Sequence, residues 1–280
     1  MYEAMMIAAT GLLNQQRRLD TIANNIANVN TVGYKNSRLD FKDALYTSGI
    51  VPGLPRTRAP EGNQQKGHGV MIAGIAKDYR TGSVQTTSRP LDVAIEGEGF
   101  FELEDVNGEI CYTRCGSFYL DDAGYLVNGN GYFIHDTDGE RIIAPYGTDT
   151  VGIDLRGVIT FTIHGAGSRE GGEGEEATER AEGEEGEVIY ETKAALGIYT
   201  FRNVTGLASV GESNYGETAA SGEKMTAENI RVRQGMLEMS NVSLAEEMTR
   251  MVRTQRAFQL ASRALTTADQ MEGIANNMRR

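Results

Sequence analysis

The hydrophobic positions near the end of the chain follow a helical period. Between residues 243 and 278 they recur at steps of three, four or seven, which places them along one stripe of an α-helix. Ser243 and Glu246 form a Ser-x-x-Glu capping box at its start. Such a helix is roughly 50 Å long, more than one small core can cover, so we expect an elongated partner. The stripe consists of Leu244, Met248, Met251, Phe258, Ala261, Leu265, Ala268, Met271, Ile274 and Met278.

A matching pattern opens the chain. Seven positions step by alternating fours and threes in a heptad register, and they are Met5, Ala9, Leu12, Gln16, Leu19, Ala23 and Ile26. We expect this helix to end in the asparagine-rich stretch 24–33. Two helices at opposite termini predict a paired rod that encloses the rest of the chain. The alternative is two ordinary helices packed on a sheet, and periodicity alone leaves it open.

The middle of the chain has the texture of short strands and tight turns. Apolar or alternating runs are separated by Asn-Gly, Asp-Gly and similar turns, and they lie at 91–96, 99–104, 110–114, 117–120, 125–127, 132–135, 141–144, 158–163, 188–201 and 229–232. The predicted class is α+β: long N- and C-terminal helices paired as a coiled-coil-like rod, with an inserted antiparallel β domain. Its expected parts are residues 1–33 with 240–280, an irregular arm at 34–70 and a β-rich domain at 71–239.

An acidic stretch interrupts the β-rich part. Residues 165–187 hold nine Glu, seven Gly and two Arg, which gives this stretch a net charge of −7 out of −12 for the chain. Such a composition cannot bury enough apolar surface to form a core, so we expect a solvated surface loop rather than a calcium site.

Composition and charge exclude several functions. The net charge of −12 argues against nucleic acid as a partner. The sequence contains no apolar run long enough for membrane insertion and no signal-peptide pattern at its start. Cys111 and Cys115 are too far apart along a strand for a disulfide, so free thiols are expected.

No candidate chemistry survives inspection of the motifs. The run 135–139, His-Asp-Thr-Asp-Gly, has the wrong spacing for a calcium loop and is predicted to be a hairpin turn. Gly97-Glu98-Gly99 lacks the rest of a dinucleotide fingerprint and is predicted to join two strands. No nucleophile with a base can be placed. We expect neither an enzyme nor a bound cofactor or metal.

Four stretches resemble the bacterial flagellar rod and hook proteins. Residues 22–35, from Ile22 to Lys35, are similar to the N-terminal signature of that family. Residues 91–101 and 112–118 resemble its central β region. Residues 206–207 and 211–222 are similar to the segment before the last helix. Residues 240–242, 247–248, 255–258 and 267–271 resemble the C-terminal helix motif. Ala261, Ser213 and Asn214 depart from the family pattern. Within the family, the length of the range 47–70 is more similar to distal rod members than to the proximal rod or the hook.

The resemblance implies a structural subunit of the flagellar rod that assembles through its terminal helices into a tubular shaft, with the β domain facing outward. The implied partners are other copies of the chain, neighbouring rod and hook proteins, the type III export apparatus and the bushing ring proteins. The implied place is the basal body. The subunit-interface residues that we expect are Met5, Leu12, Leu19, Asn24, Asn25, Ile26, Asn28, Leu244, Met248, Met251, Phe258, Leu265 and Met271. A proximal rod or hook subunit, a cytoplasmic coiled-coil scaffold and a surface enzyme or carbohydrate-binding module are the alternatives.

Overall fold

The computed structural model describes residues 2–44, 46–48, 65–67, 69–148, 150–166, 187–227 and 230–278. The chain divides into two compact units. One, called here the helical unit, comprises Met1–Asn28, Asn36–Asp78 and Val242–Arg280; the other, the β unit, comprises Val29–Lys35 and Tyr79–Asn241. The acidic stretch 165–187 lies almost wholly outside the described residues.

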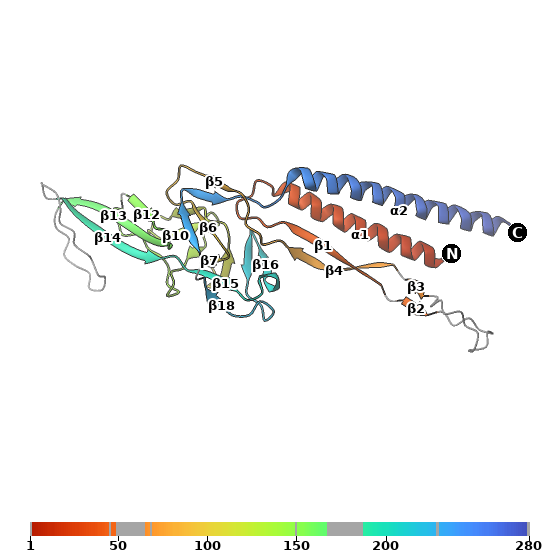
Figure 1. Ribbon diagram of the computed structural model, residues 1–280, viewed down its shortest axis with the longest axis horizontal. Helices are drawn as coiled ribbons and strands as arrows, with labels where there is room; N and C mark the ends of the chain where they lie inside the picture. Colours follow the sequence, from red (N-terminus) through yellow and green to blue (C-terminus); the bar gives the residue numbers. More distant parts are fainter. Residues whose placement is uncertain are drawn as a thin grey trace. The chain divides into compact units, whose positions relative to one another are not determined.

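Two long helices dominate the helical unit. Helix α1 spans Tyr2–Ala27 and helix α2 spans Leu244–Met278, which confirms both helices expected from the periodic pattern. Figure 1 shows them side by side and antiparallel, with the two chain termini at the same end. The α+β class is likewise confirmed, because the described chain between these helices is rich in strands.

A two-stranded antiparallel sheet lies against α1. Strand β1 (Ser37–Asp43) pairs with β4 (Val70–Lys77), and the Asn14 side chain of α1 donates a hydrogen bond of 2.6 Å to the Val70 carbonyl. Strands β2 (Tyr46–Ser48) and β3 (Gln65–Gly67) pair further along the same two chain segments. Much of the described part of 34–70 is therefore regular structure, not the irregular arm that we expected.

The β unit is built from several antiparallel sheets. The largest has the order β16-β17-β8-β7-β11-β10-β9, with β15 pairing to β7 and β18 to β15; β12-β13-β14 form a second sheet, and β19-β6 and β20-β5 form pairs. The strands are β5 (Val84–Thr86), β6 (Val93–Glu96), β7 (Phe100–Glu104), β8 (Ile110–Thr113), β9 (Phe118–Leu120), β10 (Leu126–Asn128), β11 (Phe133–Ile134), β12 (Thr150–Ile153), β13 (Val158–Ala166), β14 (Glu187–Ala195), β15 (Ile198–Phe201), β16 (Ala208–Gly211), β17 (Asn214–Gly216), β18 (Lys224–Thr226), β19 (Arg231–Gln234) and β20 (Met236–Glu238). A short 3₁₀ helix spans Val204–Gly206.

Strand β7 separates two apolar clusters. Because successive side chains of a strand point to opposite faces, Phe101 and Leu103 enter one cluster while Phe100 enters the other. The first cluster also holds Val93, Ile95, Phe118, Leu126, Ile134, Ile159, Phe161 and Val232. The second is aromatic and includes Tyr112, Tyr199, Phe201 and Tyr215. The β unit thus has a large core of its own.

Most strand predictions are confirmed, and two are wrong. The run 188–201 is two strands, because the chain breaks between β14 and β15 at Leu196 and Gly197. A Cβ at Gly197 would lie 2.9 Å from two backbone carbonyl oxygens, so only glycine allows this close crossing. The run 141–144 forms isolated bridges through Arg141 and Ile143 instead of a strand. The turns at 97–99 and 136–139 are as expected.

A buried carboxylate joins three distant segments of the β unit. Glu238 lies 2.6 Å from the Lys35 ammonium and 3.3 Å from the Arg114 guanidinium, and all three side chains are at most 3% exposed. The Gly82 amide donates to the same carboxylate at 2.9 Å. The Gly33 amide donates to the Glu238 carbonyl at 2.8 Å. The stretches 22–35 and 112–118, described above as family-like, therefore meet at one ion cluster through Lys35 and Arg114.

Replacing the buried lysine should be costly. We expect Lys35→Met to lower the free energy of unfolding of the β unit by about 3–5 kcal/mol, because it leaves a carboxylate buried beside too little positive charge. The control is Arg233→Met, which removes a half-exposed ion pair with Glu96 and should cost less than about 1 kcal/mol. Urea unfolding followed by the near-ultraviolet circular dichroism of the buried tyrosines measures both. Equal effects of the two substitutions would contradict the expectation.

A second expectation concerns backbone packing at Gly116. A Cβ at this position would lie 1.7 Å from the Val93 carbonyl oxygen, whereas at Gly152 no atom lies within 4 Å. Gly116→Ala should therefore destabilise the β unit by about 1–3 kcal/mol or more, and Gly152→Ala should be close to neutral. Thermal unfolding of the two variants, compared with the unmodified chain, gives the answer. If the Gly116→Ala chain were as stable as the Gly152→Ala chain, the segment at Gly116 and strand β6 at Val93 could move apart at little cost.

Candidate functional site

Helix α1 presents apolar side chains in three directions. Met5, Leu12, Leu19 and Ile26 are spaced by seven and are half-buried. A second direction, toward β1 and β4, carries the fully buried Ile22 with the polar Asn14 and Asn25. In a third direction Met6 and Leu13 are 51% and 57% exposed. One face of this helix is therefore apolar and uncovered.

Helix α2 shows the same surplus of apolar surface. Met251, Phe258 and Leu265 are half-buried along one row. Leu244, seven residues before Met251, begins this row and is 43% exposed. Met248, Val252 and Leu260 point in other directions and are 47–65% exposed. Charged side chains such as Arg253, Arg256 and Arg263 are also exposed. Because water-exposed apolar residues occur on several sides, α2 differs from a surface helix with a single buried stripe.

The thirteen expected interface residues fall into three groups in the structure. Half-buried side chains are those of Met5, Leu12, Leu19, Ile26, Asn28, Met251, Phe258 and Leu265. Exposed ones are those of Asn24, Leu244, Met248 and Met271. Asn25 alone among the thirteen is buried, at 1% exposure. Of the other heptad positions, Gln16 and Ala23 are exposed and Ala9 is half-buried, so part of the expected seam is open to solvent.

Asn25 forms a polar junction within the helical unit. Its side-chain nitrogen donates to the Asn36 side-chain oxygen at 2.9 Å and to the Ser37 carbonyl at 2.8 Å, and its oxygen accepts from the Ser37 amide at 3.0 Å. Glu247 of α2, 1% exposed, lies 3.4 Å from the same nitrogen and accepts a 2.7 Å hydrogen bond from Arg250. Asn25 thus has partners in its own chain, linking α1, β1 and α2.

Sequence reasoning missed two members of this junction, Asn36 and Glu247. Both look like solvated polar residues in the sequence, and only the fold brings them to Asn25. Asn24 and Asn28 act at the end of α1, where the Asn28 side chain donates to the Asn24 carbonyl at 2.9 Å and to its side-chain oxygen at 2.8 Å. Local capping therefore accounts for these two asparagines in the described chain.

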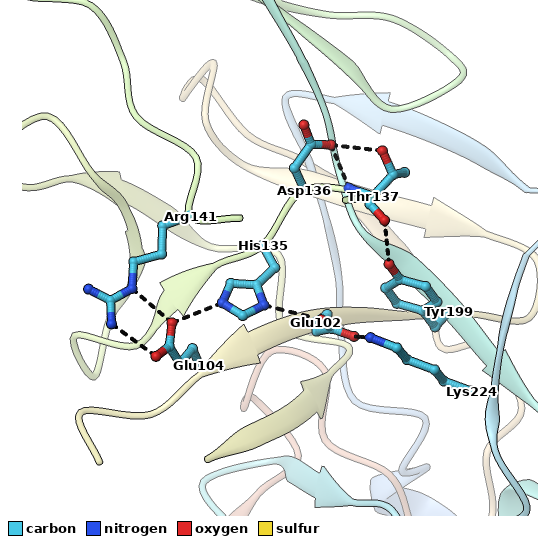
Figure 2. A network of polar contacts seen from close by, with 8 residues as sticks. All are labelled: Glu102, Glu104, His135, Asp136, Thr137, Arg141, Tyr199 and Lys224. Carbon is cyan, nitrogen blue, oxygen red and sulfur yellow. Dashed lines mark hydrogen bonds and ion pairs between the residues drawn. The ribbon is translucent and has the colours of Figure 1, made fainter. Parts of the chain in front are cut away.

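A second cluster of ionisable groups in the β unit is centred on His135 (Figure 2). Its Nδ1 lies 3.1 Å from a Glu102 oxygen and its Nε2 lies 2.9 Å from a Glu104 oxygen. Lys224 contacts Glu102 at 2.6 Å, and Arg141 contacts both oxygens of Glu104 at 2.8 and 2.9 Å. Each carboxylate is therefore already paired with a cation.

The electrostatics of this cluster favour a structural role. The hydrogen bond from Arg141, followed by that with His135, lowers the pKa of Glu104 to about 2. A carboxylate that acts as a general acid or base at neutral pH needs a raised pKa, which is the opposite direction. Next to the cluster, the Tyr199 hydroxyl donates to the Thr137 carbonyl at 3.0 Å (Figure 2). The cluster joins β7 to β18 through the Glu102–Lys224 ion pair, and it joins β7 to the segment after β11 through His135 and Arg141.

Three further expectations concern metal sites, the two cysteines and membrane-spanning helices. The described residues contain no group of three or more His, Cys, Asp or Glu side chains placed to hold a metal ion. Cys111 and Cys115 are free thiols, as expected, and burial raises the pKa of Cys111 to about 11. No helix of the described chain combines the length and the apolar character needed to cross a lipid bilayer.

Comparison with known proteins identifies the family. Residues 5–35 match the family described as "Flagella basal body rod protein". Residues 94–161 match the "Flagellar hook protein FlgE/F/G D1 domain", and residues 233–278 match the "Flagellar basal body rod FlgEFG protein C-terminal". The first match covers most of α1, the last covers α2, and the middle one covers part of the core of the β unit.

Full-length relatives agree with these matches. The flagellar basal-body rod protein FlgG of Borreliella burgdorferi is 38% identical, and FlgG of Bacillus subtilis is 34% identical; both alignments cover 100% of each chain. The flagellar hook-basal body complex protein FlhP of Bacillus subtilis is 31% identical, again over 100% of both chains. These relatives are named as structural proteins, not enzymes. The chain therefore belongs to the flagellar basal-body rod protein family and is a structural component of the flagellum basal body.

Proposed function

We propose that this rod subunit self-assembles through its helical unit into the tubular shaft that transmits motor torque to the hook. The observation that carries the proposal is the uncovered apolar surface of α1 and α2. Met6, Leu13, Val252 and Leu260 are 47–65% exposed although the helices already contact each other. Full burial of one such side chain is worth about 1.5–3 kcal/mol, so several of them can drive association of copies.

The proposed pairing of α1 with α2 is coiled-coil-like. The half-buried rows Met5, Leu12, Leu19, Ile26 and Met251, Phe258, Leu265 both repeat every seven residues, which is the spacing of a coiled-coil seam. We infer that these two rows face each other in the antiparallel pair. The exposed residues on the remaining faces then contact neighbouring subunits, in a wall made of many such pairs.

The proposal extends to the parts and partners of the subunit. Residues 1–33 and 240–280 polymerise, the range 34–70 connects, and residues 71–239 form the outer domain. Other copies of the chain occupy the sides of the shaft, and other rod and hook proteins occupy its two ends. The type III export apparatus delivers the chain, and the bushing ring proteins surround the finished rod. Support comes from the family matches and from the separation of helical and β units.

The exposed apolar face gives the first test. Leu260 is 65% exposed, so Leu260→Asp should leave the helix pair and the β unit folded while it prevents assembly. Leu260→Met is the matched control, because it keeps an apolar side chain of similar size. Sedimentation of the purified chains and swimming of cells that carry them measure the effect. Normal motility with Leu260→Asp would refute a role for this face.

The seam between the helices gives the second test. Leu265 is half-buried, and an aspartate there places a charge in the proposed seam. We expect Leu265→Asp to reduce the helical circular dichroism of the chain and to abolish rod assembly, while the unfolding transition of the β unit stays unchanged. The neighbouring exposed position provides a control in Thr266→Asp, which should retain the helical signal. Rods formed by Leu265→Asp would rule out the seam.

A further inference from the structure

Helix α2 carries a second row of residues that repeats every seven positions. Leu260 lies two residues after Phe258 of the half-buried row, so its side chain points about 200° around the helix axis from that row. We call the second row the outer row of α2. In the pairing proposed above, this row points away from α1. It consists of Arg253, Leu260, Thr267 and Ile274, and all four residues are exposed.

Helix α1 has an outer row with the same spacing. Met6, Leu13 and Asp20 each follow a member of the half-buried row of α1 by one residue, which turns them about 100° around the axis. Met6 and Leu13 are 51% and 57% exposed, and Asp20 is exposed too. Each outer row therefore combines large apolar side chains with one charged residue, an acid on α1 and a base on α2.

Neither of these charges has a partner within its own chain. The side chains of Asp20 and Arg253 make no hydrogen bond or ion pair with any other described residue. Glu246, seven residues before Arg253, differs because it is paired with Arg250. The chain thus leaves one acid and one base unpaired on the two surfaces that it also leaves uncovered.

One antiparallel alignment of the two outer rows matches both the apolar and the charged residues. With Leu13 beside Leu260, Asp20 lies beside Arg253, seven residues further along each helix. The contact then also covers Met6 at its other end. Apolar residues therefore meet apolar residues, and the acid meets the base.

A shift of this alignment by seven residues removes the match. In one direction Asp20 comes beside Glu246, and like charges repel. In the other direction Asp20 comes beside Leu260, so that Arg253 has no partner. Electrostatic complementarity thus selects one alignment of the rows.

The selected alignment places two copies at the same height. Within one chain Asn25 contacts Glu247, and the helices are antiparallel. Leu13 lies twelve residues before Asn25, and Gln259 lies twelve residues after Glu247, so these two residues are level within the chain. Contact of Leu13 with Leu260 of another copy changes this height by only one residue. Each α2 then has the α1 of its own chain on one side and the α1 of another copy on the other.

We propose that the outer row of α1 in one copy docks antiparallel on the outer row of α2 in a second copy. Leu13 lies on Leu260, and Asp20 pairs with Arg253. Burial of the apolar members supplies the attraction, and the ion pair sets the alignment. Because the contact joins different surfaces of identical chains, it propagates from copy to copy unless it closes a ring. This inference rests on the self-assembly proposed above and names the surfaces through which copies meet side by side.

Cysteine cross-linking between differently tagged full-length chains tests the contact. One chain carries Leu13→Cys and the other carries Leu260→Cys. Under mild oxidation during assembly we expect a disulfide between the two tags, because facing residues come within disulfide distance. The control partner is Val252→Cys, which is also exposed but lies about 12 Å along α2 from Leu260, and it should not link to Leu13→Cys. Burial raises the pKa of both native cysteines, Cys111 and Cys115, so their thiols react slowly.

Charge reversal supplies an independent readout. Asp20→Arg and Arg253→Asp should each raise the concentration needed for assembly by about tenfold, because each places like charges together. A chain that carries both substitutions should assemble like the unmodified chain. The control chain combines Asp20→Arg with Arg263→Asp; it should stay impaired, because Arg263 is exposed but lies about 15 Å along α2 from Arg253.

The outcomes separate this contact from self-assembly as such. Filaments that form without the 13–260 cross-link, or a double reversal no better than the single ones, would overturn the inference while leaving self-assembly intact. Disulfides between two chains that carry the same substitution would show that like rows meet, and they would overturn it as well. No assembly of the unmodified chain would contradict self-assembly and this contact together.

Discussion

The helical unit is governed by a mismatch between apolar surface and available cover. Helix α1 has apolar side chains in three directions, and in the described part of its unit it packs against helix α2 and the β1–β4 sheet. Water is a poor partner for the side chains that remain, so the free energy of the unit falls when further helices approach. In the proposed assembly, these exposed apolar residues are the ones through which copies of the chain contact each other. Polar Asn25 and Glu247 fix how the three elements meet, and the apolar residues supply the attraction.

The β unit differs from the helical unit because it has apolar clusters enclosed within itself. It encloses two apolar clusters on either side of β7, and the buried Glu238 carboxylate is matched by Lys35 and Arg114. Removal of a group from either the clusters or the charge pairs is costly because nothing outside the unit can replace it. Under the proposed assembly, the chain combines a unit that has enclosed apolar clusters of its own with a unit whose exposed apolar side chains are covered by neighbouring copies.

The sequence predicts the parts of this fold that depend on local period. The two helices and most strands were found because apolar spacing repeats over many residues, and the turns at 97–99 and 136–139 were found from their glycines. The β1–β4 pairing was missed because Ser37–Asp43 is largely polar and its partner follows after a long excursion, so no local pattern joins them. Asn25 and Glu247 were not recognised as buried for a related reason: a polar residue is buried only when distant segments satisfy it, and the sequence does not state which segments meet. The His135 cluster likewise depends on strands that are neighbours in space alone.

The ion cluster around Glu238 brings together residues that are far apart along the chain. Lys35 and Glu238 are 203 positions apart, and Arg114 and Glu238 are 124 positions apart. During synthesis, which starts at the N-terminus, Lys35 and Arg114 are made long before their shared partner Glu238. Contacts between residues so far apart in sequence form slowly, because the entropy of loop closure is lost before the contact contributes any favourable free energy. The cluster can therefore be completed only when β20, the last strand before α2, is present.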